Sequence, residues 1–191
     1  LDLTTYDEEG NPWDFTKKHM RAKAERLFDE TEPDLLVGSP PCTWWSAWQR
    51  LNHSKNFPRD WKKFKREMQE AKIHLAFVCK LYRKQMQAGR LFLHEHPASA
   101  SSWKESVVKR VYANEDVEKI IMHQCAYGQR SAEGEAVKKP TTWMSNSPDI
   151  LAQLGKRCSG TKGMCSSTGR PHQACSGKTA REAAVYPFEI C

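Results

Sequence analysis

The chain has 191 residues, enough for one domain with a small appendage, and 39% of them are hydrophobic. It can therefore bury a core, so wholesale disorder is excluded, and the lack of an apolar run of about 18 residues excludes a membrane span. The first residues do not follow the pattern of a signal peptide, and we interpret the chain as part of a longer polypeptide or assembly.

The charge of the chain is unevenly distributed. Lys and Arg number 30 against 23 Asp and Glu, which gives +7. Residues 1–39 carry a net charge of −5, residues 40–90 a net charge of +9, and residues 156–181 six basic and no acidic side chains. Such basic segments suit nucleic acid, DNA in particular, and the candidate contacts are Arg50, Lys62, Lys65 and Arg66. The alternative is a solvated, lysine-rich helix face.

The predicted elements alternate between helices and strands. In chain order we expect a surface helix over 16–31, a strand over 34–38, a loop over 43–58 and a long helix over 60–88. A strand over 91–94 that breaks into a turn at Glu95, a helix over 102–112 and a strand over 117–124 follow. A strand over 141–145, a helix over 148–154 and a short closing helix that begins at Thr179 and ends near Pro187 complete the chain.

This alternation predicts an α/β fold with a mostly parallel sheet. We assign residues 1–154 to the α/β domain. Residues 155–191 are rich in Gly, Ser, Cys and Lys, cannot form an apolar core alone, and are predicted to be a Cys/His-rich appendage. The seven cysteines are an odd number without secretory signals, which favours a reducing, intracellular compartment, nucleus or cytoplasm.

Two predicted strands end beside residues with reactive side chains, Cys42 and Glu95. Ligands of open α/β sheets bind beyond the carboxyl ends of the strands, so neighbouring parallel strands would bring this thiol and this carboxylic acid to one crevice. The alternatives are a tight turn with a buried thiol for Cys42 and a capping or salt-bridge role for Glu95.

Three segments resemble motifs of the DNA cytosine carbon-5 methyltransferases. Gly38-Ser-Pro-Pro-Cys42, followed by Ser46, is similar to the Pro-Cys loop of that family. Phe92-Leu-His-Glu95-His-Pro97 is similar to its Phe-x-x-Glu-Asn-Val segment, and Tyr127-Gly-Gln129-Arg130 to part of its Gln-x-Arg-x-Arg segment. More closely, the chain resembles divergent methyltransferase-like domains from phage and from retrotransposon-type polyproteins of protists. It rests on Ser39–Thr43, Leu51-Asn52, Lys139-Pro-Thr141 and Tyr186-Pro187.

The resemblance implies an incomplete Rossmann-like methyltransferase fold and a defined chemistry. The Cys42 thiolate would add to carbon 6 of a flipped cytosine, and Glu95 would assist at ring nitrogen 3. Gln129 and Arg130 would belong to the same catalytic site. S-adenosylmethionine would donate the methyl group, with Asp14 and Phe15 in the position of the motif that contacts its adenine.

The chain departs from the family in two respects. The glycine-rich turn that holds the methionine end of the cofactor is absent, as is the acidic residue that binds its ribose. The family's Asn and Val after the glutamate are His96 and Pro97 here. We therefore expect no independent cofactor binding. A catalytically inactive nucleic-acid-binding module and a structural subunit of a larger assembly remain alternatives to the enzyme.

A second constellation lies in the C-terminal segment. Cys158, Cys165, His172 and Cys175 are soft metal ligands in a stretch with few apolar residues, and Cys125 could replace one of them. Structural zinc sites stabilise such segments in place of a core, so a zinc site is predicted here.

Overall fold

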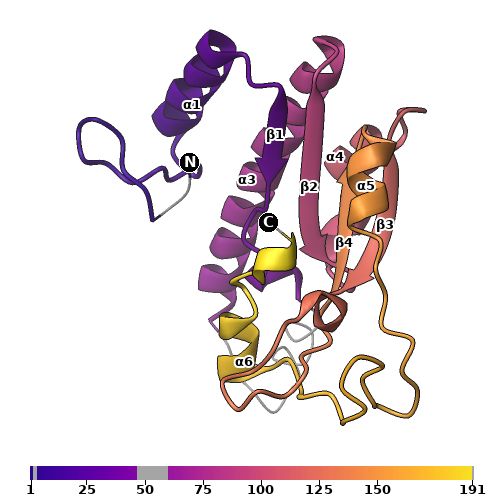
Figure 1. Ribbon diagram of the computed structural model, residues 1–191. Coiled ribbons are helices and arrows are strands. Elements are labelled where there is room, and N and C mark those ends of the chain that lie inside the picture. Colours follow the sequence, from indigo (N-terminus) through magenta and orange to yellow (C-terminus); the bar gives the residue numbers. More distant parts are fainter. Residues whose placement is uncertain (2–3, 47–59, 191) are drawn as a thin grey trace. The chain divides into compact units, whose positions relative to one another are not determined.

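The structure is a computed structural model that describes residue 1, residues 4–46 and residues 60–190. Its elements are α1 (Lys18–Thr31), β1 (Leu35–Gly38), η1 (Thr43–Trp45), α3 (Trp61–Gln87), β2 (Leu91–Pro97), η2 (Ser101–Lys104), α4 (Ser106–Tyr112), β3 (Glu118–His123), η3 (Gln124–Tyr127), β4 (Pro140–Ser145), α5 (Pro148–Gln153), α6 (Gly177–Glu182) and η4 (Phe188–Ile190). Figure 1 shows them along the chain. None of the described helices is both long enough and apolar enough to cross a lipid bilayer.

The strands form one open, four-stranded sheet in the order β1-β2-β4-β3. The fold is therefore α/β. Strands β1 and β2 are neighbours, as the predicted crevice for Cys42 and Glu95 requires. The prediction of a mostly parallel sheet is not borne out, because β3 and β4 pair antiparallel from Glu118↔Ser145 to His123↔Pro140 and make the sheet mixed. Residues 124–139 contain no α-helix that could cross over the sheet, and a connection without a crossover favours antiparallel pairing.

The chain divides into two compact units. Unit 1 comprises residues 1–93 and 100–115, and unit 2 comprises residues 94–99 and 116–191. The predicted boundary at residue 154 follows composition, whereas these units follow contacts in space, and the two divisions differ.

Helix α3 confirms the prediction of one continuous helix over 60–88. Its first turn is capped by Asp60, whose carboxylate accepts hydrogen bonds from the backbone N–H groups of Lys62 and Lys63. Leu75, Val78 and Tyr82 are buried as the apolar periodicity predicts.

The first two turns of α3 differ from the expected burial. Trp61 is 55% exposed, and Phe64 and Met68 are only partly buried. The helix instead buries its C-terminal half on two sides. Phe77 and Leu81 pack with Met20, Ala24 and Phe28 of α1 in the core of unit 1. A helix that contacts both a sheet and another helix buries more than one stripe, which a single 3-4 repeat does not predict.

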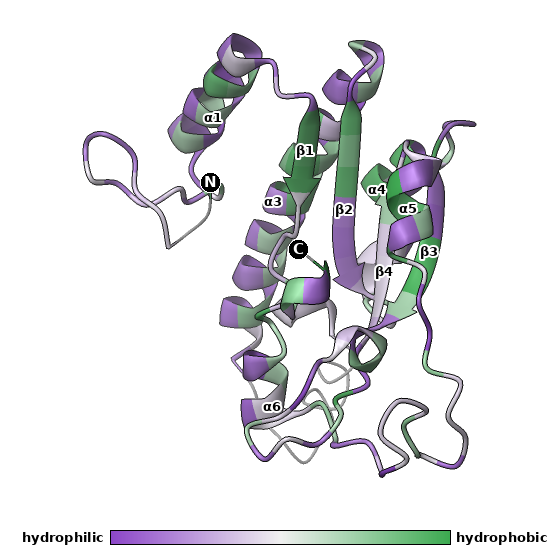
Figure 2. Ribbon diagram, viewed as in Figure 1, coloured by the Kyte–Doolittle hydropathy of each residue, from purple (hydrophilic) through white to green (hydrophobic). Residues whose placement is uncertain are grey.

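Strand β2 is longer than predicted. It continues through Glu95 to Pro97, so Glu95 lies within the strand and does not follow it. The backbone continues beside β4, where the N–H of Ala98 donates to the carbonyl of Pro140. Figure 2 shows the resulting contrast, because the first half of β2 is hydrophobic and the last part is hydrophilic.

The C-terminal part of unit 2 contains less helix than predicted. Helix α5 begins after Ser147, whose hydroxyl accepts from the N–H of Ile150, as expected of a Ser-Pro start. Helix α6 ends at Glu182, before the predicted end near Pro187, and the last described residues form the single turn η4.

Candidate metal centre and polar site

Three cysteines and one histidine of unit 2 converge on one point. The ligand atoms of Cys125, Cys158, Cys165 and His172 all lie within 4.8 Å of one another. The Nε2 of His172 is 3.4 Å from the Sγ of Cys125 and 3.5 Å from the Sγ of Cys158. Three thiols and an imidazole at such separations form a ligand set that can hold a metal ion.

Local backbone contacts position these four side chains. Cys125 lies in η3 directly after β3, and the N–H of Cys158 donates to the Nδ1 of His123 at 3.0 Å. The turn that carries Cys158 and Cys165 requires glycine at position 160, where a Cβ atom would collide with the carbonyl oxygen of Met164. The sequence therefore folds this segment into a tight loop with both thiols on the inside.

The orientation of His172 suits metal binding. Its Nδ1 lies 2.8 Å from the carbonyl oxygen of Gly163, which makes Nδ1 the hydrogen-bond donor and leaves Nε2 facing the thiols. A second ring nitrogen fixed by a backbone carbonyl is the usual arrangement of a histidine that binds a metal.

The thiols differ in how easily they ionise. Burial opposes ionisation of Cys158, but hydrogen bonds from Ser166 lower its pKa to about 5. Burial likewise opposes ionisation of Cys165, yet hydrogen bonds from Ser167 lower its pKa to about 7. Burial, together with the neighbouring Cys158 and Cys165, raises the pKa of Cys125 to about 12. Three adjacent thiolates repel one another, so full ionisation of the cluster needs a cation among them.

The predicted ligand Cys175 is not part of this cluster, and Cys125 takes its place. The N–H of Gln173 donates to the carbonyl of Ala136, and Val137 pairs with Gln173 in a parallel bridge. This pairing directs the chain away from the cluster after His172. Burial raises the pKa of Cys175, and the charge of Lys139 opposes this in part.

A second group of polar side chains in unit 2 lies around Tyr186 and includes Glu95. Glu95 is 5% exposed. Its carboxylate, Gln124 and Thr141 all lie close enough to the Tyr186 phenol to influence its ionisation. Burial raises the pKa of this phenol, and the charge of Glu95 raises it further.

Gln129 and Arg130 also belong to unit 2. Gln129 is buried, and its Nε2 donates to the carbonyl of Arg130 at 3.4 Å. The guanidinium of Arg130 donates to the backbone carbonyl of Gln129 at 3.0 Å. Both side chains are therefore engaged with the local backbone, and their predicted catalytic role stays a prediction.

Cys42 lies in unit 1 directly before η1. It is partly buried, and its carbonyl accepts from the N–H of Trp45 at 3.0 Å, which closes the turn after Pro40 and Pro41. Since Cys42 belongs to unit 1 and Glu95 to unit 2, a crevice shared by the two residues stays a prediction.

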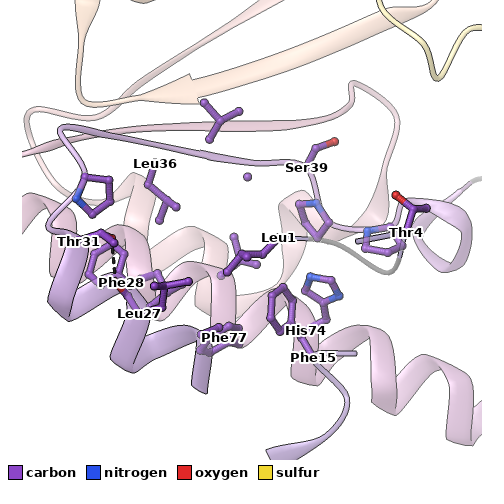
Figure 3. Close-up of a pocket in the computed structure, with 18 residues that line it drawn as sticks. Leu1, Thr4, Phe15, Leu27, Phe28, Thr31, Leu36, Ser39, His74 and Phe77 are labelled. Carbon is purple, nitrogen blue, oxygen red and sulfur yellow. Dashed lines mark hydrogen bonds between the residues drawn. The ribbon is translucent and has the colours of Figure 1, made fainter. Parts of the chain in front are cut away.

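Unit 1 contains an apolar cavity of about 450 Å³ next to this turn. Figure 3 shows Phe15, Phe28 and Phe77 along one side of it and Leu36 and Ser39 along the other. The remaining lining residues are Leu1, Thr4, Ala24, Leu27, Thr31, Pro33, Val37, Gly38, Pro40, Pro41, His74, Val78 and Leu81.

Of the two predicted cofactor contacts, Phe15 lines the apolar cavity and Asp14 does not. Asp14 lines a smaller neighbouring pocket of about 160 Å³ together with Glu67 and Glu70. Its carboxylate accepts from the hydroxyl and the N–H of Thr16, at 2.6 and 2.9 Å. The aspartate therefore already stabilises a local turn.

The predicted nucleic-acid contacts on α3 are solvent-exposed. Lys62, Lys65 and Arg66 lie on the surface of the helix, and Arg66 is 4.0 Å from Glu70. Arg50 lies outside the described residues. In unit 2, Arg157 donates to the carbonyl of Ile121, so part of the basic charge of residues 156–181 serves the fold.

These observations define the protein as an open, mixed α/β sheet protein with a candidate Cys₃His metal centre. Comparison with protein-family models, with curated proteins and with solved structures gives no match.

Proposed function

We propose that the protein is a zinc-stabilised, nucleic-acid-binding protein that acts on cytosine in the manner of the cytosine carbon-5 methyltransferases. The observation that carries the proposal is the environment of Glu95, a carboxylate retained at 5% exposure among the polar side chains of Gln124, Thr141 and Tyr186. Burying a carboxylate costs free energy, so such groups are concentrated at sites of binding or catalysis.

Zinc is the metal that this ligand set fits best. Thiolate sulfur and imidazole nitrogen favour Zn²⁺, and four protein ligands complete its tetrahedral shell. Such a closed shell leaves no position for a substrate, so the role of the metal is structural. It would fasten residues 158–172 to η3, in a segment whose buried core consists of Cys125, Ala136, Cys158 and Cys165.

The proposed chemistry assigns one role to each reactive residue. The Cys42 thiolate forms a bond to carbon 6 of cytosine, and the electron pair of the 5,6 double bond moves into the ring. Glu95 holds a proton at ring nitrogen 3, which stabilises the negative charge of the adduct. The proposal requires both residues to meet the same base, and the experiment below tests that requirement.

S-adenosylmethionine fits the described residues only in part. The apolar cavity lined by Phe15 can accommodate an aromatic ring such as adenine. Its described lining contains no carboxylate for the ribose hydroxyls or the ammonium group, and the acidic side chains lie in the smaller pocket with Asp14. The residues present do not fit the whole cofactor, so no methyl-transfer step is derived.

The experiment that tests the proposal is covalent trapping on an oligonucleotide that carries 5-azacytosine. In this base, carbon 6 accepts the thiolate and ring nitrogen 5 takes up a proton, so a stable adduct forms without a methyl donor. The zinc-loaded protein is incubated with DNA and RNA versions and analysed by intact-mass and peptide mass spectrometry. We expect one adduct per chain, located at Cys42.

Two variants and one control make the result specific. Cys42→Ser should abolish the adduct, and Glu95→Gln should slow its formation by a factor of about 10² or more. Cys79→Ser is the control, because burial raises the pKa of that thiol to about 12 and makes it unreactive. Nucleic-acid binding without any adduct would contradict the catalytic role and favour the binding module, to which the incomplete cofactor fit also points.

A further inference from the structure

Several buried polar atoms of unit 2 have no hydrogen-bond partner among the described residues. They are the amide Nε2 and Oε1 of Gln124, the Oε1 of Gln129, the indole Nε1 of Trp143 and the hydroxyl of Tyr186. Gln124 is 0% exposed, so both ends of its amide are removed from water. Buried polar groups in native proteins are nearly always paired, with protein, with water or with a ligand.

These groups gather at one place. Gln124 lies close enough to Tyr186 to lower the pKa of its phenol, and Glu95 lies close enough to raise it. The rings of Trp143 and Tyr186 have centroids 5.8 Å apart. The side chains come from β2, η3, β4 and the C-terminal segment, the last of which is yellow in Figure 1. Four separate parts of the unit therefore supply one polar cluster.

Tyr127, in the same unit, shows what a tyrosine with a purely structural hydroxyl looks like. Its hydroxyl donates to the carbonyl of Gln153 at 2.9 Å and accepts from the N–H of Lys156 at 3.0 Å. The chain thus satisfies the phenol of Tyr127 completely, whereas the hydroxyl of Tyr186 has no partner with good hydrogen-bond geometry among the described residues, although Glu95, Thr141 and Gln124 lie beside it.

The chemistry of the cluster indicates the class of ligand. An amide offers a donor and an acceptor side by side, a phenol offers either, and two aromatic rings lie beside them. The ammonium of Lys139, which lies over the Tyr186 ring, already donates to the carbonyl of Ala183 at 3.0 Å. The site therefore suits a neutral planar ring with an alternating donor and acceptor edge.

We infer that Gln124 and Tyr186, with Glu95, form a binding site for a pyrimidine base, in which the Gln124 amide and the Tyr186 hydroxyl select the ring edge. This inference rests on the proposed function, because it assigns the groups that would recognise the base at Glu95. Loss of either group removes a hydrogen bond to the ring and leaves the unit folded.

The test compares ligand affinity and thermal stability in the same variants. The zinc-loaded full chain is titrated with cytidine, uridine and adenosine, followed by saturation-transfer NMR, and its unfolding midpoint is measured without ligand. Tyr186→Phe and Gln124→Met should weaken cytidine binding by about 5- to 20-fold, as the loss of one or two hydrogen bonds predicts. Both should keep or raise the midpoint of the free protein, because they remove buried groups that lack partners.

Matched controls separate this result from a structural role. Tyr127→Phe should lower the unfolding midpoint and leave cytidine binding unchanged, since that hydroxyl has two partners. Gln153→Met, on the exposed face of α5, should change neither quantity. Adenosine should bind more weakly than cytidine, because a purine is larger than the ring proposed.

Three outcomes would overturn the inference. The first is the absence of pyrimidine nucleoside binding to the unmodified protein. The second is a lower midpoint with unchanged binding in Tyr186→Phe, which would assign the hydroxyl to a structural water. The third is a normal Cys42 adduct together with normal cytidine binding in both variants, which would leave the proposed function standing and refute only the role of Gln124 and Tyr186.

Discussion

The imidazole of His172 lies 3.4 Å from the thiol of Cys125, although 47 positions separate the two residues. This contact connects a loop with few apolar residues to the end of β3. The buried cluster here consists of Cys125, Ala136, Cys158 and Cys165, so three of its four members are also candidate metal ligands, and the metal centre should have direct consequences for the stability of unit 2.

Zinc should bind with a stoichiometry of one per chain and depend on Cys125. Cys125→Ser should weaken zinc affinity by at least about 100-fold, because it replaces a thiolate ligand by a hydroxyl. Cys175→Ser is the matched control and should leave affinity unchanged, since Cys175 is outside the cluster. Competition with a chromogenic chelator measures both. Equal losses in the two variants would show that the ligand set is wrong.

Removal of zinc should unfold the metal loop before the rest of the chain. A chelator should raise amide hydrogen exchange at residues 158–172 by a factor of about 10² or more, because binding free energy is folding free energy in such sites. Exchange in α3 should change little. Hydrogen exchange followed by mass spectrometry resolves the two regions, and uniform protection after chelation would mean that the loop does not need the metal.

Leu75→Ala should destabilise the protein by about 2–5 kcal/mol, because Leu75 is fully buried and its truncation leaves a cavity. Lys65→Ala, on the exposed side of the same helix, should cost less than about 0.5 kcal/mol. Chemical denaturation of both variants measures the difference. A similar cost at the two positions would contradict the burial of α3 described above.

The ion pairs of Glu25 should produce a defined dependence on pH. The Lys80 ammonium, 2.6 Å away, and that of Lys84 hold the pKa of the Glu25 carboxyl below its ordinary value despite partial burial. Its contribution, about 0.5–1 kcal/mol for a pair near the surface, is therefore present at neutral pH and lost as the pH falls through the lowered pKa.

The measurement is the unfolding midpoint of the unmodified protein and of Glu25→Gln between pH 3 and pH 7. The difference between the two should be largest at neutral pH and vanish at the acid end. Glu30→Gln serves as the control on the exposed side of α1. A difference that grows as the pH falls would have the wrong sign for a lowered pKa.

Nucleic-acid binding should weaken steeply with salt. Each phosphate contact releases counterions and adds nearly one unit to the log–log slope, and we expect about four to six contacts. Reversing the charges of Lys62, Lys65 and Arg66 together should reduce affinity alike for all sequences, because such contacts carry no base specificity. Filter binding at several salt concentrations tests this, and no affinity at low salt would refute both nucleic-acid hypotheses.

The helices and strands followed from the sequence where the local pattern was strong. The stripe through Leu75 and Tyr82 predicted α3, and the Ser147-Pro148 start predicted α5. The antiparallel pairing of β3 and β4 was missed, because strand direction depends on the route of the connecting chain, which apolar alternation does not record. The end of β2 was missed because buried polar residues such as Glu95 read locally as a turn.

The sequence predicted three of the four metal ligands, Cys158, Cys165 and His172, and offered Cys125 as a replacement for one of the set. It could not decide between Cys175 and Cys125, because Cys125 lies in a distant element and only the fold brings it to the others. The roles proposed for Gln124 and Tyr186 had no signal beyond the Tyr-Pro pair, since a single glutamine or tyrosine has no periodic or spacing pattern.

Gly38 shows that the loop before Cys42 and helix α3 are not free to vary separately. A Cβ atom at position 38 would overlap the hydroxyl of Tyr82, whose ring stacks on Phe92 with centroids 4.6 Å apart. Any larger residue at position 38 therefore demands a smaller one at position 82. Among sequences descended from a common ancestor with this chain, changes at these two positions should occur in pairs, and a tyrosine retained at 82 should be accompanied by glycine at 38.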